Sequence, residues 1–264
     1  RDKSTGTRYK IFKILSLGWT GAHEQWRHYT RGYLFFAALA TPLVISVHSV
    51  VSWDFALGIV PGWHTTIFAP YFVAGAIHSG LAMVLTLMIP LRKLFKYEDI
   101  ITIEVLQNVA KTIVLTGLIV GLAYGTEYFI AWYSHNTIEM EQFRWRALGD
   151  YRWGFYFMVL CNTLIPLLFV FKKVRTTIAT LFIISLIVNF GMWWERFVII
   201  VGGVAHGFAP HAWGLYTPTL IEFGIMLGAF CLFFFLFVLF ARHLPSVSMT
   251  EMKETLAEGA GHVA

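Results

Sequence analysis

The chain has 264 residues, of which 57% are hydrophobic and 13% charged, with a mean hydropathy of +0.65. These values exclude an ordinary soluble domain and predict an all-α polytopic membrane protein. The net charge of +5 is typical of some nucleic-acid-binding proteins, but in a membrane chain a basic excess usually reports topology. We therefore expect no nucleic-acid partner. The two cysteines, Cys161 and Cys231, lie far apart in apolar runs and form no metal-binding motif.

Residues 1–32 are basic and aromatic, and they predict a cytoplasmic or interfacial segment. Within it, residues 9–17 fit either a short amphipathic surface helix or a solvated linker. Six apolar runs follow, each of about 18–25 residues, which is the length a helix needs to cross about 30 Å of hydrocarbon. The predicted transmembrane helices of the bundle, 33–242, are 33–53, 67–91, 109–133, 154–171, 177–201 and 218–241. Residues 243–264 are predicted to form a cytoplasmic tail.

The basic residues are distributed unevenly over the two sides of this predicted bundle. Sixteen of the 20 Lys and Arg residues fall on the side of the N-terminal segment, the tail and the loops 92–108 and 172–176. The opposite loops, 54–66, 134–153 and 202–217, hold Arg144, Arg146 and Arg152, while Arg196 falls inside a span. By the positive-inside rule, both ends of the chain are predicted to be cytoplasmic.

Ionisable side chains inside the spans are candidates for function, because each costs about 2.5–3.5 kcal/mol or more at a helix centre unless it is paired or hydrated. Counted along the helix axis, all but one of them lie within about 10 Å of the outer surface. The candidates in this layer are His48, Asp54, Glu127, Glu195, Arg196 and Glu222, and His78 lies near the midplane. Their common depth predicts a shared polar cavity on the outer side.

Each acidic candidate also has a purely structural interpretation. Glu195 and Arg196 are sequence neighbours whose side chains diverge by about 100° on a helix, so we expect them to pair with different helices. An interhelical salt bridge from Arg196 to Glu127 or Glu222 is one such possibility. Glu222 also fits a favourable charge in a first helical turn. Asp54 fits a cap at the bilayer surface.

The two histidines of the spans differ in depth and setting. His48 fits a satisfied packing residue as well as a functional one. His78 is flanked by Gly75 and Gly80, which suit close helix packing, and a midplane proton relay is the alternative. A transmembrane haem needs two histidines at matching depth, and these differ by about 9 Å. We expect no haem or iron–sulfur cluster in this chain.

Three stretches carry a resemblance to a known family. They are SVHSVVSWDF with PGWHTTIFAPYFVAGAIHSG within residues 46–80, EYFIAWYS at 127–134, and NFGMWWERFVII at 189–200. Together they resemble the NrfD-like family, whose type member is the polysulfide reductase membrane subunit. Within it the chain is most similar to the ActC type of the bacterial alternative complex III, with the paralogous ActF type of the same complex next. The ActC type has more spans than the six here, so the chain would correspond to its later, C-terminal part.

The resemblance implies a multi-pass subunit of a respiratory quinol oxidoreductase in the bacterial inner membrane. In that family menaquinol is oxidised near the periplasmic face. Electrons pass to an iron–sulfur protein and then to c-type haem proteins, beside a second NrfD-like membrane subunit, and protons leave outward. His48 and Asp54 would face the quinol head group as hydrogen-bond partner and proton acceptor. The remaining candidates would line the quinol site or a proton path: Glu127, Glu195, Arg196, Glu222 and His78.

Two other functions fit parts of the pattern. An ActF-like protein would use the polar layer as a proton path or as structural ion pairs in a scaffold, without quinone. A secondary transporter is expected to show inverted repeats and helices interrupted near the midplane. The sequence shows neither feature, and its ionisable layer lies near one surface. A quinol-oxidising membrane subunit is therefore the primary prediction.

Overall fold

The computed structural model describes residues 5–243, so the predicted tail beyond His243 lies outside the described residues. Within this part, six helical segments are long and apolar enough to cross a membrane. They are α2 (His23–Ala56), α3 (Phe68–Leu94), α4 (Ile103–Tyr133), the segment Arg152–Val170, α8 (Ile178–Ala205) and α9 (Leu220–His243). Each contains one predicted span, and the all-α polytopic fold is confirmed.

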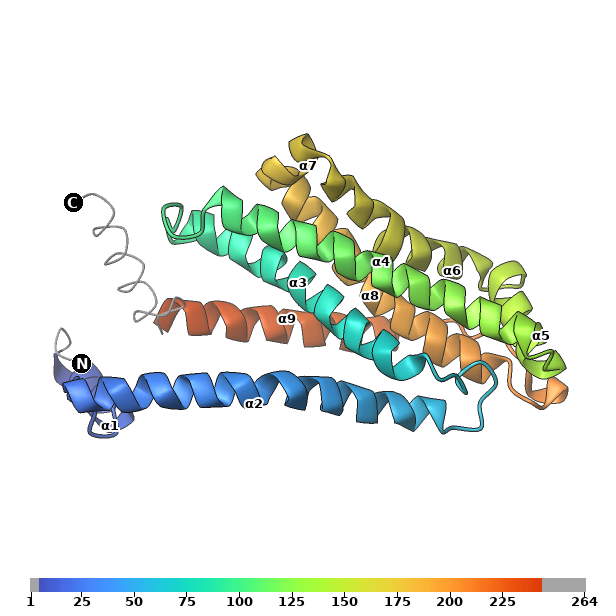
Figure 1. Ribbon diagram of the computed structural model, residues 1–264, viewed down its shortest axis with the longest axis horizontal. Helices are drawn as coiled ribbons and strands as arrows, with labels where there is room; N and C mark the ends of the chain where they lie inside the picture. The colour runs from blue at the N-terminus through green and yellow to red at the C-terminus, as the bar shows by residue number, and fades with distance from the viewer. Residues whose placement is uncertain (1–4, 244–264) are drawn as a thin grey trace.

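The helices run lengthwise, and both described ends of the chain lie at the same end of the bundle (Figure 1). The opposite end carries the short helix α5 (Thr137–Leu148), the loop 57–67 and the segment 206–219, which includes the 3-10 turn η3 (Pro210–Ala212). We call this the outer end, following the charge distribution. Which side of the membrane it faces stays a prediction.

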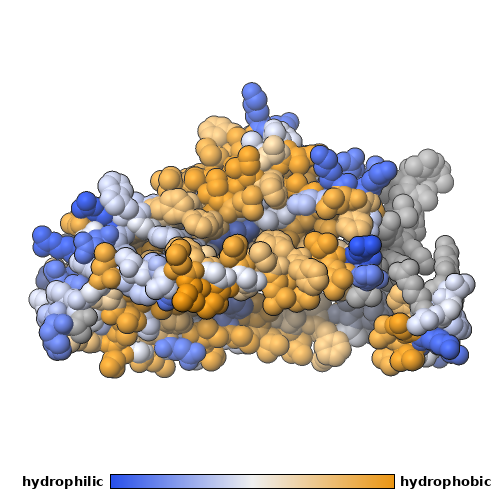
Figure 2. Space-filling model, turned by 180° about the vertical axis from the view of Figure 1, so that it is seen from behind, coloured by the Kyte–Doolittle hydropathy of each residue, from blue (hydrophilic) through white to orange (hydrophobic). Residues whose placement is uncertain are grey.

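The surface has the pattern that a bilayer requires. Hydrophobic side chains form a broad belt over the middle of the molecule, and hydrophilic residues gather towards its two ends (Figure 2). Helices suit this setting because every unpaired backbone amide in hydrocarbon would cost several kcal/mol. Near the N-terminus, α1 (Gly6–Leu15) exposes Ile11, Ile14 and Leu15. The region expected to hold a surface helix is therefore helical.

The core is formed by α3, α4, α8 and the segment Arg152–Val170. One cluster of buried apolar side chains fills the half away from the outer end, around Leu85, Leu106 and Leu181. A second, aromatic cluster around Phe68 and Tyr124 fills the outer half. Helices α2 and α9 lie at the periphery: in the described chain, the most apolar stretch of each contains no buried residue. The core is thus a four-segment bundle with two loosely attached helices.

The fourth span is irregular where a uniform helix was expected. It begins as α6 (Arg152–Val159), continues as the π-helix η1 (Leu160–Leu164) and ends as the 3-10 helix η2 (Ile165–Val170). Pro166 lacks a backbone N–H and cannot complete the α-helical ladder, which accounts for a change of helix type here. The short helix α7 (Lys172–Thr176) follows.

The π-helix packs unusually close to α8 at Gly191. A Cβ atom at that position would clash with Asn162 Oδ1 and with Cys161 Cβ. Any larger residue at this position would therefore force the two helices apart. The close contact brings the polar side chain of Asn162 into the centre of the bundle, where it is fully buried.

Candidate functional site

The largest described cavity lies between α2, α3, α8 and α9. Its volume is about 890 Å³, within the range of small-molecule sites. Most of the lining is apolar, with Met, Phe, Leu, Ala and Trp side chains from α3, α8 and α9. Its polar lining residues are His48, Ser79, Thr86, Asn189 and Arg196. We call it the polar cavity; it contains two of the predicted site residues, His48 and Arg196.

Arg196 offers a hydrogen-bond donor at this cavity. Its guanidinium carbon lies 4.6 Å from the centroid of the Phe72 ring, a cation–π contact that fixes the group against α3. Its Nη2 lies 3.5 Å from Glu195 Oε1, while its buried Nη1 has no hydrogen-bond partner within the described chain. A buried donor without a partner is costly, so a ligand oxygen that accepts from it would be favoured.

His48 offers the complementary acceptor. Its Nδ1 lies 2.8 Å from the carbonyl oxygen of Val44, one turn earlier on α2. Because a carbonyl oxygen only accepts, this contact assigns the hydrogen of the neutral ring to Nδ1. The Nε2 atom is then left with a lone pair, and His48 can accept a proton or a hydrogen bond there. The cavity thus combines one donor and one acceptor in apolar surroundings.

Glu195 and Arg196 pair with each other, and the expectation that they pair with different helices was wrong. Glu195 is fully buried inside the bundle, whereas the Arg196 side chain is 36% exposed. The two side chains do leave α8 in different directions, but the long arginine side chain reaches back to the carboxylate. Sequence reasoning on backbone directions did not include that reach.

The other oxygen of Glu195 belongs to a hydrogen-bond cluster that links three spans. Glu195 Oε2 accepts from the Tyr124 hydroxyl of α4 and from Asn162 Nδ2 of η1, the latter at 3.2 Å. Asn162 Nδ2 also lies 3.0 Å from the Tyr124 hydroxyl oxygen. Tyr124 and Asn162 were missed because only ionisable groups were sought in the spans. An amide inside an apolar run was the signal that could have found Asn162.

Glu127 forms a second buried pair, with a residue that was read as an ordinary loop charge. Arg146 of α5 places Nη1 3.6 Å from Glu127 Oε2, and the two side chains are 4% and 5% exposed. Helix α5 therefore folds back over the outer end of the bundle. The nearby Gly62 has φ of +80°, and a Cβ atom there would lie 3.3 Å from Arg146 Nη2. The loop 57–67 can approach α5 this closely because that position is glycine.

Gln142, His206 and two tryptophans complete this outer cap. Gln142 Nε2 donates to the Gly202 carbonyl at 3.1 Å, and its Oε1 lies 2.9 Å from His206 Nδ1. The His206 ring stacks between Trp145 and Trp213, with centroid distances of 4.5 Å and 3.7 Å. Burial lowers the pKa of His206 below its usual value, and the charge of Glu141 opposes this shift. The cap therefore favours the neutral imidazole.

The remaining predicted site residues lie outside both the polar cavity and the Glu195 cluster. Asp54 is exposed on α2, beyond His48 towards the outer end. Glu222 is exposed and accepts hydrogen bonds from the backbone and hydroxyl of Thr219 at 2.6 Å and 2.7 Å, a capping box at the start of α9. His78 is fully buried, with Nδ1 2.9 Å from Thr116 Oγ1 of α4. Among residues 5–243, no group of three or more His, Cys, Asp or Glu side chains is placed to hold a metal ion.

Replacing Arg146 with Met should destabilise the protein by about 3–5 kcal/mol, because it leaves Glu127 buried without its partner. The double substitution Arg146→Met with Glu127→Leu should recover most of this loss, since it removes both charges. Denaturant unfolding of the purified membrane protein, compared across the two single variants and the double variant, measures the coupling. Additive losses would show that the pair contributes no coupling energy.

The outer cap should weaken in acid. Because the folded-state pKa of His206 lies below its usual value of about 6.5, the unfolded state binds more protons, and stability falls as the pH drops below about 6.5. Hydrogen exchange of the α5 amides, corrected for intrinsic rates, should be faster at pH 5 than at pH 7.5. His206→Phe keeps an aromatic ring but cannot titrate, and it should remove this pH dependence. An unchanged pH dependence in that variant would assign the effect to another group.

Comparison with known proteins assigns the chain to a family. The family described as polysulphide reductase, NrfD, matches residues 8–207. A Halobacterium salinarum protein, named as a "Putative dimethyl sulfoxide reductase membrane subunit", is 25% identical, with 86% of this chain and 57% of that protein covered. The chain thus spans little more than half the length of this relative. It belongs to the polysulphide reductase NrfD family of membrane proteins.

Proposed function

We propose that this chain is the quinone-reactive membrane subunit of a respiratory oxidoreductase complex, with the quinol head group in the polar cavity. The observation that carries the proposal is the pairing of the unsatisfied Arg196 Nη1 donor with the His48 acceptor, inside apolar walls of ligand size. The family assignment supports it, and so does the name of the relative, which is that of a reductase membrane subunit.

A quinol head group matches this set of side chains. It is a flat, largely apolar ring with an oxygen on each of two opposite edges. Arg196 would donate to one oxygen, and His48 Nε2 would accept the proton of a hydroxyl group. The Phe and Met side chains of α3, α8 and α9 would hold the ring and exclude water. These roles use only groups that line the cavity.

Oxidation of a quinol releases protons and electrons, and the fold suggests where each would go. Asp54 lies six residues beyond His48 on α2, about 9 Å further out along the helix axis. We assign it to the exit path, as the acceptor that receives a proton from His48. Glu195 would hold Arg196 in place, and Glu127, Glu222 and His78 would support the site or extend a proton path.

In the finer form of the proposal, the substrate is menaquinol, the outer end faces the periplasm, and the chain acts as the ActC component of an alternative complex III. Electrons would pass to an iron–sulfur protein docked at the outer end and then to c-type haem proteins, beside a second NrfD-like membrane subunit, with outward proton translocation. The short outer loops and the α5 cap offer the docking surface that such a partner needs.

One observation favours a second candidate function. The Glu195 cluster and the Glu127–Arg146 pair lie inside the bundle and not along the cavity wall. An ActF-like protein could use these groups for proton conduction, or as structural ties in a scaffold, without binding quinone. Substitutions confined to the cavity wall separate this function from the first.

Arg196→Gln should raise the KM for quinol by about tenfold or more, because a charge-assisted hydrogen bond to the head group is lost. His48→Gln should lower kcat, since an amide does not accept the proton. Steady-state quinol oxidation by the assembled complex measures both. Arg152→Gln, at an arginine outside the cavity, is the control and should leave both constants unchanged. Wild-type kinetics in both cavity variants would favour the non-quinone function.

Asp54→Asn should lower quinol oxidation while the complex assembles normally, because the substitution removes a proton acceptor and retains the side-chain shape. The fall should appear in kcat and not in KM, since Asp54 does not line the cavity. Unchanged turnover would remove Asp54 from the mechanism and leave it as a surface residue.

A further inference from the structure

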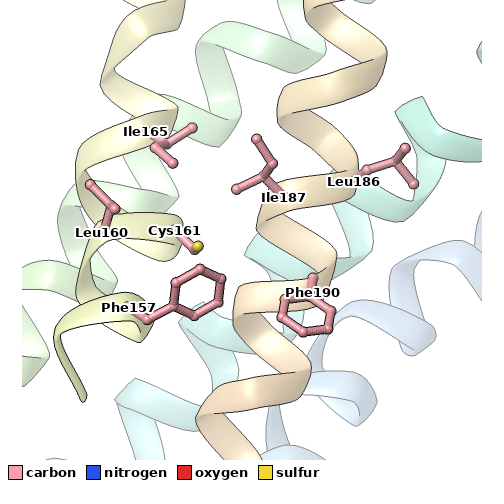
Figure 3. Close-up of a pocket in the computed structure, with 7 residues that line it drawn as sticks. All are labelled: Phe157, Leu160, Cys161, Ile165, Leu186, Ile187 and Phe190. Carbon is pink, nitrogen blue, oxygen red and sulfur yellow. The ribbon is translucent and has the colours of Figure 1, made fainter. Parts of the chain in front are cut away.

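A second hollow lies on the other side of the same stretch of α8. It is a groove of about 310 Å³ between α8 and the fourth span, shown in Figure 3. All of its lining side chains are apolar or carry only a thiol: Phe157, Leu160, Cys161, Ile165, Leu186, Ile187 and Phe190. We call it the apolar groove.

The irregular fourth span shapes this groove. Leu160 and Cys161 belong to the π-helix, and Ile165 begins the 3-10 helix, so the wall does not follow regular α-helical spacing. Figure 3 shows Leu160 and Ile165 on one wall, with Ile187 and Phe190 on the other. Cys161 lies between them and is buried, while Leu160 and Phe190 are 43% and 50% exposed. The groove therefore opens at the apolar surface.

The groove and the polar cavity share two lining residues, Leu186 and Phe190 of α8. These two side chains form a ridge between the hollows. Along α8, Phe190 lies about 9 Å and Leu186 about 15 Å from Arg196, in the direction away from the outer end. A molecule with a polar head at Arg196 and a long apolar tail would meet the groove next, at greater depth in the membrane.

We propose that the apolar groove binds the isoprenoid tail of the quinol whose head group occupies the polar cavity. The inference rests on the proposed function and adds a tail-binding site. The occupant is argued from the shared ridge, the apolar lining and the greater depth of the groove. Because lipid chains are as apolar as this lining, the gain on binding comes from shape and van der Waals packing and not from the hydrophobic effect.

Filling the groove should discriminate between quinols by their tails. Ile187→Trp places a bulky ring in the groove, and Ile187 does not line the polar cavity. Ile183→Trp, one turn away on α8 at a residue that is 54% exposed and lines neither hollow, is the matched control. The assay measures KM in the assembled complex for a long-tailed menaquinol and for a tail-less naphthoquinol with the same ring.

For Ile187→Trp we expect the KM of the long-tailed quinol to rise by about fivefold and that of the tail-less quinol to stay unchanged. The control should leave both constants unchanged. Normal kinetics with the tail-less quinol show that the variant is folded and assembled. If the long-tailed and tail-less quinols respond equally to Ile187→Trp, the inference is overturned.

A photoreactive tail identifies the occupant directly. A menaquinone with a diazirine near the head-proximal end of its tail should label the fourth span or α8 at the groove, and Ile187→Trp should reduce that labelling. Labelling by a diazirine phospholipid that excess menaquinone does not displace would assign the groove to lipid and overturn the inference. Failure of the proposed function gives a different result, since the wild-type complex would then neither bind nor oxidise either quinol.

Discussion

The structure depends on one desolvated carboxylate. Glu195 lies at the centre of the bundle with no solvent exposure, and a buried carboxylate is tolerated only when partners surround it. Tyr124 and Asn162 hold one of its oxygens and Arg196 lies beside the other, so the same group ties α4 and the fourth span to α8. By holding the guanidinium at 3.5 Å, it also keeps a positive charge at the wall of the polar cavity. Packing and the proposed chemistry are thus linked through one side chain.

The outer end is organised by the same requirement on a smaller scale. The Glu127–Arg146 pair and the Gln142–His206 contact fasten α5 over the bundle, so a segment of the chain that is neither long nor apolar becomes part of the core. Trp63 adds to this closure by donating from Nε1 to the Ile199 carbonyl at 2.8 Å. Polar groups at this end are paired within the chain and shielded from water. The outer surface can therefore be flat and short-looped without exposing the buried acids.

The sequence was sufficient for the spans because hydrocarbon thickness and backbone hydrogen bonding leave few solutions. It also placed the acidic residues at one depth. Depth, however, does not determine the direction in which a side chain points around the helix axis, and Asp54 and Glu222 face outward while Glu127 and Glu195 face inward. Arg146 could not be identified as a core residue because its burial depends on α5 folding back. The π-helix at Asn162 depends on packing against Gly191, which no local pattern reveals.

The tight contact at Gly191 has a mechanical consequence. It joins the fourth span and α8 into a stiff pair, so the wall of the polar cavity that carries Arg196 has little freedom to move. The opposing walls belong to α2 and α9, whose most apolar stretches have no buried residue in the described chain. Breathing of the cavity must fall on those two helices. A ligand would then enter sideways, from the plane of the bilayer, at a rate that depends on the fluidity of the surrounding lipid.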